Sequence, residues 1–151
     1  MMDLIKDSRL TDLTVENLMI LEDKVAHVQL NNPLEHALLV LVKSGYSAVP
    51  VLDNSYKLVG TIGKTVILDH IIGLERFEGE KLSEKYVHEV VNTEIPILKK
   101  EDTLLTGLDK VINYPFVCVV DEGGYFAGIL TRRAILKQMK RDYYQKGNDH
   151  Q

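Results

Sequence analysis

Residues 45–53 read Gly-Tyr-Ser-Ala-Val-Pro-Val-Leu-Asp, and residues 113–121 repeat this pattern as Asn-Tyr-Pro-Phe-Val-Cys-Val-Val-Asp. The stretches that follow are also matched, Leu-Val-Gly-Thr-Ile at 58–62 and Phe-Ala-Gly-Ile-Leu at 126–130. Tyr46 and Tyr114 lie 68 positions apart (114 − 46), and the other matched pairs keep the same spacing. A solenoid needs at least three short units to bury a continuous core. Two long copies therefore indicate a pseudo-symmetric pair, and such pairs place binding clefts between their halves.

The composition is that of a globular protein. The chain has 151 residues, of which 45% are hydrophobic and 26% charged, which allows one domain with a substantial core. The formal net charge of −4 argues against a general nucleic-acid binder, because such proteins need a basic face. The longest uninterrupted apolar run has six residues, far short of the roughly 20 that span a membrane. The acidic start is not typical of a secretory signal. We therefore expect a cytoplasmic protein that binds neither nucleic acid nor membrane.

Each half is predicted to form a strand, a helix, two strands and a second helix, in that order. In the first half, Asn32 is expected to cap a helix that ends at Gly45, because Asn is favoured at helix starts and Gly just after helix ends. The expected elements are an extended run at 25–30, a helix at 33–44, strands at 48–52 and 57–62, and a helix at 64–72.

The second half repeats this order, with Asp102 expected to cap its first helix. The expected elements are a strand at 95–98, a helix at 103–112, strands at 116–120 and 125–131, and a helix at 133–144. Ile135, Leu136 and Met139 are predicted as the core face of the last helix. The first helices of the two halves align 70 positions apart (104 − 34) and the strands 68, so the second half lacks two residues between helix and strand.

These patterns predict an α/β fold of two β-α-β-β-α repeats. The expected boundaries are a first repeat at 14–76, a linker at 77–86, a second repeat at 87–140, and terminal extensions at 1–13 and 145–151. Residues 15–19 and 87–91 look like matching lead-in segments before each repeat. The tail at 145–151 lacks apolar anchors and is expected to fray. Cys118, the single cysteine, lies in a predicted buried strand, so we expect an inert core thiol.

The repeated unit resembles the cystathionine-β-synthase (CBS) domain, and a tandem pair of such domains resembles a Bateman module. The resemblance covers nearly the whole chain, from about residue 14 to residue 139. Four stretches further resemble the stand-alone CBS proteins of Gram-positive bacteria that bind cyclic di-AMP, the DarB or CbpB type. They are Asp-Lys-Val-Ala-His-Val at 23–28, Leu-Glu-His-Ala-Leu-Leu-Val-Leu at 34–41, Gly-Leu-Glu-Arg at 73–76 and Thr-Arg-Arg at 131–133. The resemblance implies a disc-like homodimer, formed through helical faces at 33–44 and 103–112, with two equivalent ligand sites.

Thr131, Arg132 and Arg133 form the best phosphate site that the sequence offers. They lie where a predicted strand meets a predicted helix, and free amides and the helix dipole favour a phosphate there. Adjacent guanidinium groups add bidentate donors. Taken alone, two arginines at a helix start would more often be a solvated surface pair. Their position in a repeated cleft favours the ligand-binding interpretation.

In CBS pairs, this junction of one repeat faces the lead strand of the other repeat. The resemblance therefore implies an inter-repeat cleft that brings Lys24, Val25 and Ala26 next to Arg132 and Arg133, so that three cations converge. In this cleft Tyr46 is expected to flank a purine and Ser47 to donate a hydrogen bond to it. The expected ligand-binding residues are Lys24, Val25, Ala26, Tyr46, Ser47, Ala48, Thr131, Arg132 and Arg133.

One departure from the family pattern bears on the ligand. Many CBS repeats that bind AMP or ATP carry an Asp three residues after the Ser or Thr, where it accepts hydrogen bonds from both ribose hydroxyls. That position is Ala134 here. In the first repeat, Gly63 stands at the position of the Ser or Thr and Val66 at the position of the Asp, so both the hydroxyl and the acid are missing. A cyclic dinucleotide has no free 2′,3′-diol, and its two phosphates call for cations. The pattern thus favours cyclic di-AMP over AMP or ATP, and a weak or empty first-repeat site at Lys64 and Thr65.

Catalysis is not expected, because the chain has no Gly-rich phosphate loop, nucleophile elbow or cluster of metal ligands. We expect no cofactor and no metal. The function hypothesis is a non-enzymatic receptor that binds cyclic di-AMP and controls binding to a target protein. The resemblance implies a target such as the (p)ppGpp synthetase Rel or a central metabolic carboxylase. The alternatives are an AMP- or ATP-sensing module and an interaction scaffold with an empty cleft.

Overall fold

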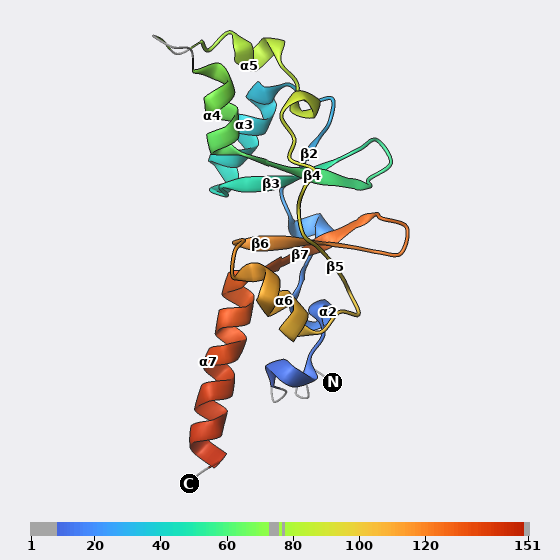
Figure 1. The fold of residues 1–151 in the computed structure, drawn as a ribbon, viewed down its shortest axis with the longest axis vertical. Helices are drawn as coiled ribbons and strands as arrows, with labels where there is room; N and C mark the ends of the chain where they lie inside the picture. The colour runs from blue at the N-terminus through green and yellow to red at the C-terminus, as the bar shows by residue number, and fades with distance from the viewer. Residues whose placement is uncertain (1–8, 73–75, 77, 150–151) are drawn as a thin grey trace. The chain divides into compact units, whose positions relative to one another are not determined.

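The structure, a computed structural model, describes residues 9–72, 76 and 78–149 (Figure 1). Residues 73–75, part of one stretch that resembles the cyclic di-AMP-binding proteins, lie outside the described residues, as do most of the extension 1–13 and the last two residues. The chain divides into two compact units. Unit 1 comprises Met1–Val25, Pro96–Glu122 and Ala127–Gln151, and unit 2 comprises Ala26–Ile95 and Gly123–Phe126.

Unit 2 is built on a three-stranded sheet with the order β2-β3-β4. β2 (Val28–Gln29) runs parallel to β3 (Ala48–Leu52), and β3 forms an antiparallel hairpin with β4 (Leu58–Gly63). The helices of the unit are α3 (Leu34–Ser44), α4 (Lys64–Ile71), α5 (Lys81–Glu84) and the 3-10 helix η3 (Val87–Glu89). Its core joins α3, β3, β4 and α4 through Leu34, Leu41, Val49, Ile62 and Ile67, each at most 2% exposed.

Unit 1 repeats this plan around a four-stranded sheet with the order β1-β7-β6-β5. Its strands are β1 (Ile20–Leu21), β5 (Ile97–Lys99), β6 (Phe116–Val120) and β7 (Phe126–Thr131). Its helices are η1 (Leu10–Asp12), α2 (Val15–Leu18), η2 (Glu22–Lys24), α6 (Leu104–Val111) and α7 (Arg132–Asp149). The predicted α/β fold of two β-α-β-β-α repeats is confirmed, and β3 and β6 begin and end where the sequence predicts.

The lead-in segments pack against the opposite repeat. In unit 1, the amide of Val15 donates to the carbonyl of Asp102 at 2.8 Å. In unit 2, the amide of Val87 donates in the same way to the carbonyl of Asn32 at 2.9 Å. Each unit therefore combines the lead-in of one sequence repeat with the strands and helices of the other, so the compact units cut across the repeats expected at 14–76 and 87–140.

Two glycines allow this exchange. A Cβ atom at Gly60 would lie 2.1 Å from the carbonyl oxygen of Asn92, and one at Gly128 would lie 2.1 Å from that of Ile20. Ile20 belongs to β1, and Asn92 follows the second lead-in, so the two approaches are equivalent. Gly128 also has a φ of 151°, which side chains rarely adopt. Only glycine lets the backbone of each lead-in come this close.

Both predicted helix caps are wrong, for the same reason. α3 begins at Leu34 after Pro33, and the side chain of Asn32 instead accepts from the amide of Gln29 at 2.8 Å. The Asp102 carboxylate likewise accepts from the amide of Lys99 at 2.8 Å. These side chains close the turn that precedes the helix by bonding three residues back, as Asn and Asp often do. The hydroxyl that caps α6 belongs to Thr103 and accepts from Thr106.

The inward face of α7 also differs from the prediction. Ile135 is buried as expected, but Leu136 and Met139 are 54% and 41% exposed. The buried partner on this face is Gln138, whose amide donates to the Asp142 carboxylate at 2.9 Å, and that carboxylate accepts from the amide of Leu10 at 2.8 Å. Docking of the segment at Leu10 thus sets which face of the helix points inward.

The two ends of α7 also lie outside their predicted bounds. The helix begins one residue early, at Arg132, and continues to Asp149, through most of the tail that was expected to fray. Extending an existing helix costs little, because each added residue contributes a hydrogen bond without a new nucleation step.

We expect Gly60→Ala to lower the free energy of unfolding by about 3 kcal/mol, because the backbone of the lead-in must move away from the added methyl group. Urea denaturation at fixed protein concentration measures this loss. Gly63→Ala in the same strand is the matched control, since its Cβ would meet the nearest atom, the Ser47 carbonyl oxygen, at 3.2 Å. Equal losses from the two variants would contradict the close-approach explanation.

Burial raises the pKa of the Cys118 thiol to about 12. The thiolate is the reactive form, so the native protein should resist a thiol reagent such as DTNB at pH 8, whereas protein unfolded in guanidinium should react at once. The folded state keeps the neutral thiol, so Cys118 favours folding fully below the ordinary thiol pKa, and this contribution is lost as the pH rises toward 12. Rapid labelling of the native protein would show that Cys118 is accessible.

Candidate ligand-binding site

The start of α7 presents a partly satisfied helix terminus. The hydroxyl of Thr131 accepts from the amide of Ala134 at 3.0 Å and so caps the helix. The amide of Arg132 donates to the carbonyl of Pro115 at 2.9 Å. Across the described ranges, the exposed guanidinium of Arg133 has no hydrogen-bond or ion-pair partner. Of the two predicted arginines, Arg133 is therefore the one whose whole side chain is available to an anion.

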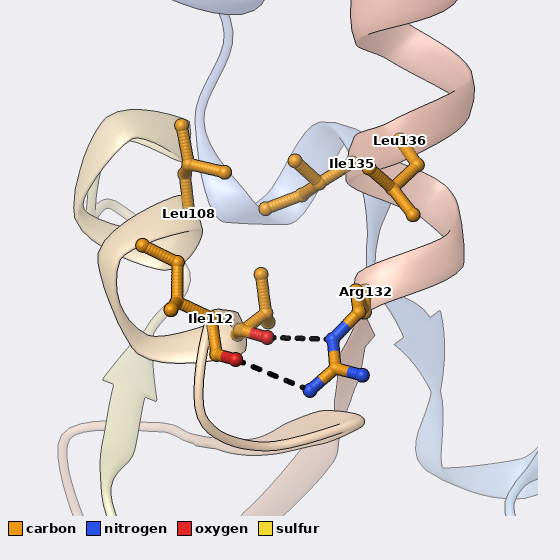
Figure 2. Close-up of a pocket in the computed structure, with 6 residues that line it drawn as sticks. Leu108, Ile112, Arg132, Ile135 and Leu136 are labelled. Atoms are coloured by element: carbon orange, nitrogen blue, oxygen red, sulfur yellow. Dashed lines mark hydrogen bonds between the residues drawn. The ribbon is translucent and has the colours of Figure 1, made fainter.

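Arg132 has a structural role that the sequence analysis missed. Its Nε donates to the carbonyl of Val111 at 2.8 Å, and its Nη2 lies 3.4 Å from the carbonyl of Ile112 (Figure 2). These carbonyls form the carboxyl end of α6, where helices leave acceptors unpaired and carry partial negative charge. The guanidinium thus caps α6 from the first residue of α7.

The need for this cap follows from the two residues that the second repeat lacks. α3 ends on Gly45, which adopts a left-handed conformation (φ 77°) and donates its amide to the carbonyl of Leu41. α6 ends at Val111, and the residue that follows, Ile112, keeps right-handed helical angles with no glycine after it. The shorter connection removes the glycine, and the Arg132 side chain donates to the last carbonyls instead. The missing glycine was the sequence signal for the Arg132 contact.

The first repeat has a plainer version of the same junction. Lys64, the first residue of α4, donates its amide to the carbonyl of Ser47 at 3.0 Å, as Arg132 does to Pro115. Gly63 occupies the capping position and has no side chain to offer. This junction thus lacks both the hydroxyl and the guanidinium of its counterpart.

The lead-strand residues lie on either side of the division between units. Lys24 ends η2 and is exposed, Val25 is 6% exposed, and Ala26 begins unit 2. β1 runs antiparallel to β7 and pairs Leu21 with Gly128, so it heads toward the start of β7, whereas the arginines follow its end. Strand pairing therefore does not bring Lys24 alongside Arg132.

The residues predicted to border a purine belong to unit 2. Tyr46 is 38% exposed, and its amide donates to the hydroxyl of Ser44. Ser47 is exposed and Ala48, the first residue of β3, is half-buried. Within the part of the chain that the structure describes, the Tyr46 ring stacks on no other ring and the Ser47 hydroxyl makes no hydrogen bond. Both are free to contact a ligand.

A shallow apolar groove of about 320 Å³ lies in unit 1 between α6 and α7 (Figure 2). Arg132 lies at one end of it. The lining residues are Leu108, Val111, Ile112, Arg132, Ile135 and Leu136. Ile112 is 65% exposed, because the end of α6 opens onto this groove.

Two features are absent from the described residues, 9–72, 76 and 78–149. These residues contain no group of three or more His, Cys, Asp or Glu side chains that could hold a metal ion. They also contain no helix with the length and apolar character needed to cross a membrane.

Comparison with known proteins identifies close relatives. The chain is 50% identical over 137 residues to "Cyclic di-AMP receptor B" of Bacillus subtilis, covering 91% of this chain and 93% of that protein. It is 46% identical to a crystal structure of Listeria monocytogenes CbpB in complex with c-di-AMP, with a TM-score of 0.80, covering 87% and 98% of the two chains. A CBS-domain protein of unknown function from Bacillus anthracis is 57% identical, with a TM-score of 0.83, covering 87% and 96%.

The sequence model of the CBS domain matches residues 15–73 and 87–141. These two segments make up more than half of the chain and confirm the predicted tandem pair. They coincide with the two matched halves whose lead-ins are exchanged between the units. The chain belongs to the CBS-domain family, as a tandem pair of CBS repeats similar to the cyclic di-AMP-binding proteins of Bacillus and Listeria.

Proposed function

We propose that this protein is a receptor for cyclic di-AMP. The observation that carries the proposal is the 50% identity over 137 residues to a protein named cyclic di-AMP receptor B. The similarity to CbpB in complex with c-di-AMP, over 98% of that chain, supports it. Because both alignments span nearly the full length of the compared chains, the likeness extends beyond the general fold.

The chemistry of the α7 start suits a phosphodiester. Arg133 places an unpaired guanidinium at a helix terminus, where the helix dipole also favours an anion. Arg132 contributes a second positive charge beside it. Ala134 occupies the place where an acid would bind a free ribose diol, so the site lacks the group that AMP or ATP would use. These features favour a ligand that has two phosphodiesters and no free diol.

We assign the remaining contacts as the sequence analysis expects. Tyr46, Ser47 and Ala48 contact a base, and Ala26 and Val25 contact the ligand through their backbone or methyl groups. Lys24 contributes a third positive charge to the ligand, in addition to those of Arg132 and Arg133. Separate substitutions at Lys24 and Arg133 would measure the two contributions.

The receptor acts without catalysis, in the cytoplasm and as a homodimer. Exposed apolar side chains on α3 and α6 support dimerisation through these helices, namely Leu39, Val42, Leu105 and Ile112, each at least 50% exposed. The ligand regulates a target protein, such as a (p)ppGpp synthetase or a metabolic carboxylase. It does so because its affinity differs between the free receptor and the receptor bound to the target.

Isothermal titration calorimetry with cyclic di-AMP, cyclic di-GMP, AMP and ATP tests the ligand assignment. We expect cyclic di-AMP to bind at one ligand per chain, and at least 100-fold more tightly than AMP or ATP, a difference of about 2.8 kcal/mol. Tighter binding of AMP or ATP would make the protein an adenylate sensor. No heat from any of the four would favour the interaction scaffold.

Arg133→Ala tests the phosphate contact. Loss of one charge-assisted contact should weaken cyclic di-AMP binding about 10- to 100-fold, while the denaturation midpoint stays unchanged because the exposed side chain makes no hydrogen bond or ion pair with another described residue. The matched control is Lys137→Ala, which removes an exposed cation one turn further along α7. Equal affinity of the Arg133→Ala variant and wild type would remove Arg133 from the site.

A further inference from the structure

Arg132 contacts three parts of unit 1. Its backbone starts α7, its guanidinium caps α6, and its side chain lines the groove between the two helices (Figure 2). We propose that Arg132 couples the ligand to α6. The edge of its guanidinium that does not contact α6 donates to a ligand phosphodiester, and ligand binding thereby stabilises the last turn of the helix. This inference rests on the proposed function.

The donors of the guanidinium are sufficient for both partners. Arginine carries five N–H groups. The contacts to Val111 and Ile112 use the Nε hydrogen and one Nη2 hydrogen. Both Nη1 hydrogens and the second Nη2 hydrogen remain, and Figure 2 shows Nη1 pointing away from the two carbonyls. This free edge can bind two oxygens of one phosphate side by side, so the α6 cap need not break.

The cap also orients the guanidinium before the ligand arrives. A free arginine side chain loses rotamer entropy when it binds, and the contact with Val111 has already removed part of that freedom. The advantage is reciprocal, because coupling between two sites has the same magnitude in both directions. A ligand that holds the Arg132 side chain in place therefore also stabilises the α6 carbonyls that it caps.

α6 is sensitive to this contact. It has eight residues, too few for a helix that is stable by itself, and it lacks a glycine cap. Its last turn supplies Leu108, Val111 and Ile112 to the groove. A change in the order of this turn therefore alters an exposed apolar surface. α3, which ends on Gly45, gives no such dependence on a side chain from the next helix.

Hydrogen–deuterium exchange with and without saturating cyclic di-AMP tests the coupling. We expect amide exchange in residues 109–114 to slow at least threefold on ligand addition, with a smaller change in residues 41–46 at the end of α3, which serve as the internal reference. Arg132→Lys keeps the charge but cannot bridge the two carbonyls and a phosphate. Without ligand, the 109–114 segment of this variant should exchange faster than that of wild type. Saturating cyclic di-AMP should not slow its exchange, and calorimetry checks that the variant is saturated.

The outcomes separate the coupling from the proposed function. If cyclic di-AMP binds but slows amide exchange at 109–114 no more than at 41–46, the coupling is overturned and the receptor assignment stands. Absence of cyclic di-AMP binding to wild type would overturn both. The third comparison is made without ligand. If the 109–114 segment of Arg132→Lys exchanges at the same rate as in wild type and in the control Lys137→Ala, Arg132 does not hold the end of α6. That result would overturn the coupling even if Arg132→Lys no longer binds the ligand.

Discussion

The structure depends on a backbone-to-backbone contact made once in each unit. The chain around Ile20 lies against Gly128, and the chain around Asn92 lies against Gly60, each so close that a methyl group on the glycine would overlap a carbonyl oxygen. These contacts fix the lead-in of each repeat to the strands of the other. Neither sequence repeat can complete a compact unit alone, because part of each unit comes from the other half of the chain. A CBS pair of this kind is thus interlocked by its connections.

The two repeats diverge at the junction that binds phosphate in the proposed function. The first repeat keeps Gly45 as a helix cap and has Gly63 and Lys64 at the strand–helix junction. The second lacks the glycine, so Arg132 caps α6 and Thr131 caps α7. In the repeat with the shorter connection, a cationic side chain caps the helix in place of glycine. The side chain that caps α6 also places positive charge next to Arg133.

Most of the fold could be predicted because its strongest signals are local. β3 and β6 are unbroken apolar runs between turn residues, and both were predicted at their observed ends. The errors arose where a local pattern met a distant partner. Leu136 and Met139 suggested an apolar core face, but Asp142 and Gln138 face inward because the segment at Leu10 docks there. Which face a helix buries depends on what packs against it, and periodicity does not identify that partner.

The candidate site could be predicted by residue type but only in part by role. An Arg-Arg pair at a strand–helix junction was visible in the sequence, whereas the commitment of Arg132 to α6 depends on a carbonyl 21 positions earlier in the chain. The direct test of the account is a crystal structure of this chain with cyclic di-AMP. The account predicts a ligand phosphodiester on the guanidinium of Arg133, with the contact between Arg132 Nε and the Val111 carbonyl retained. A ligand bound away from the start of α7 would contradict it.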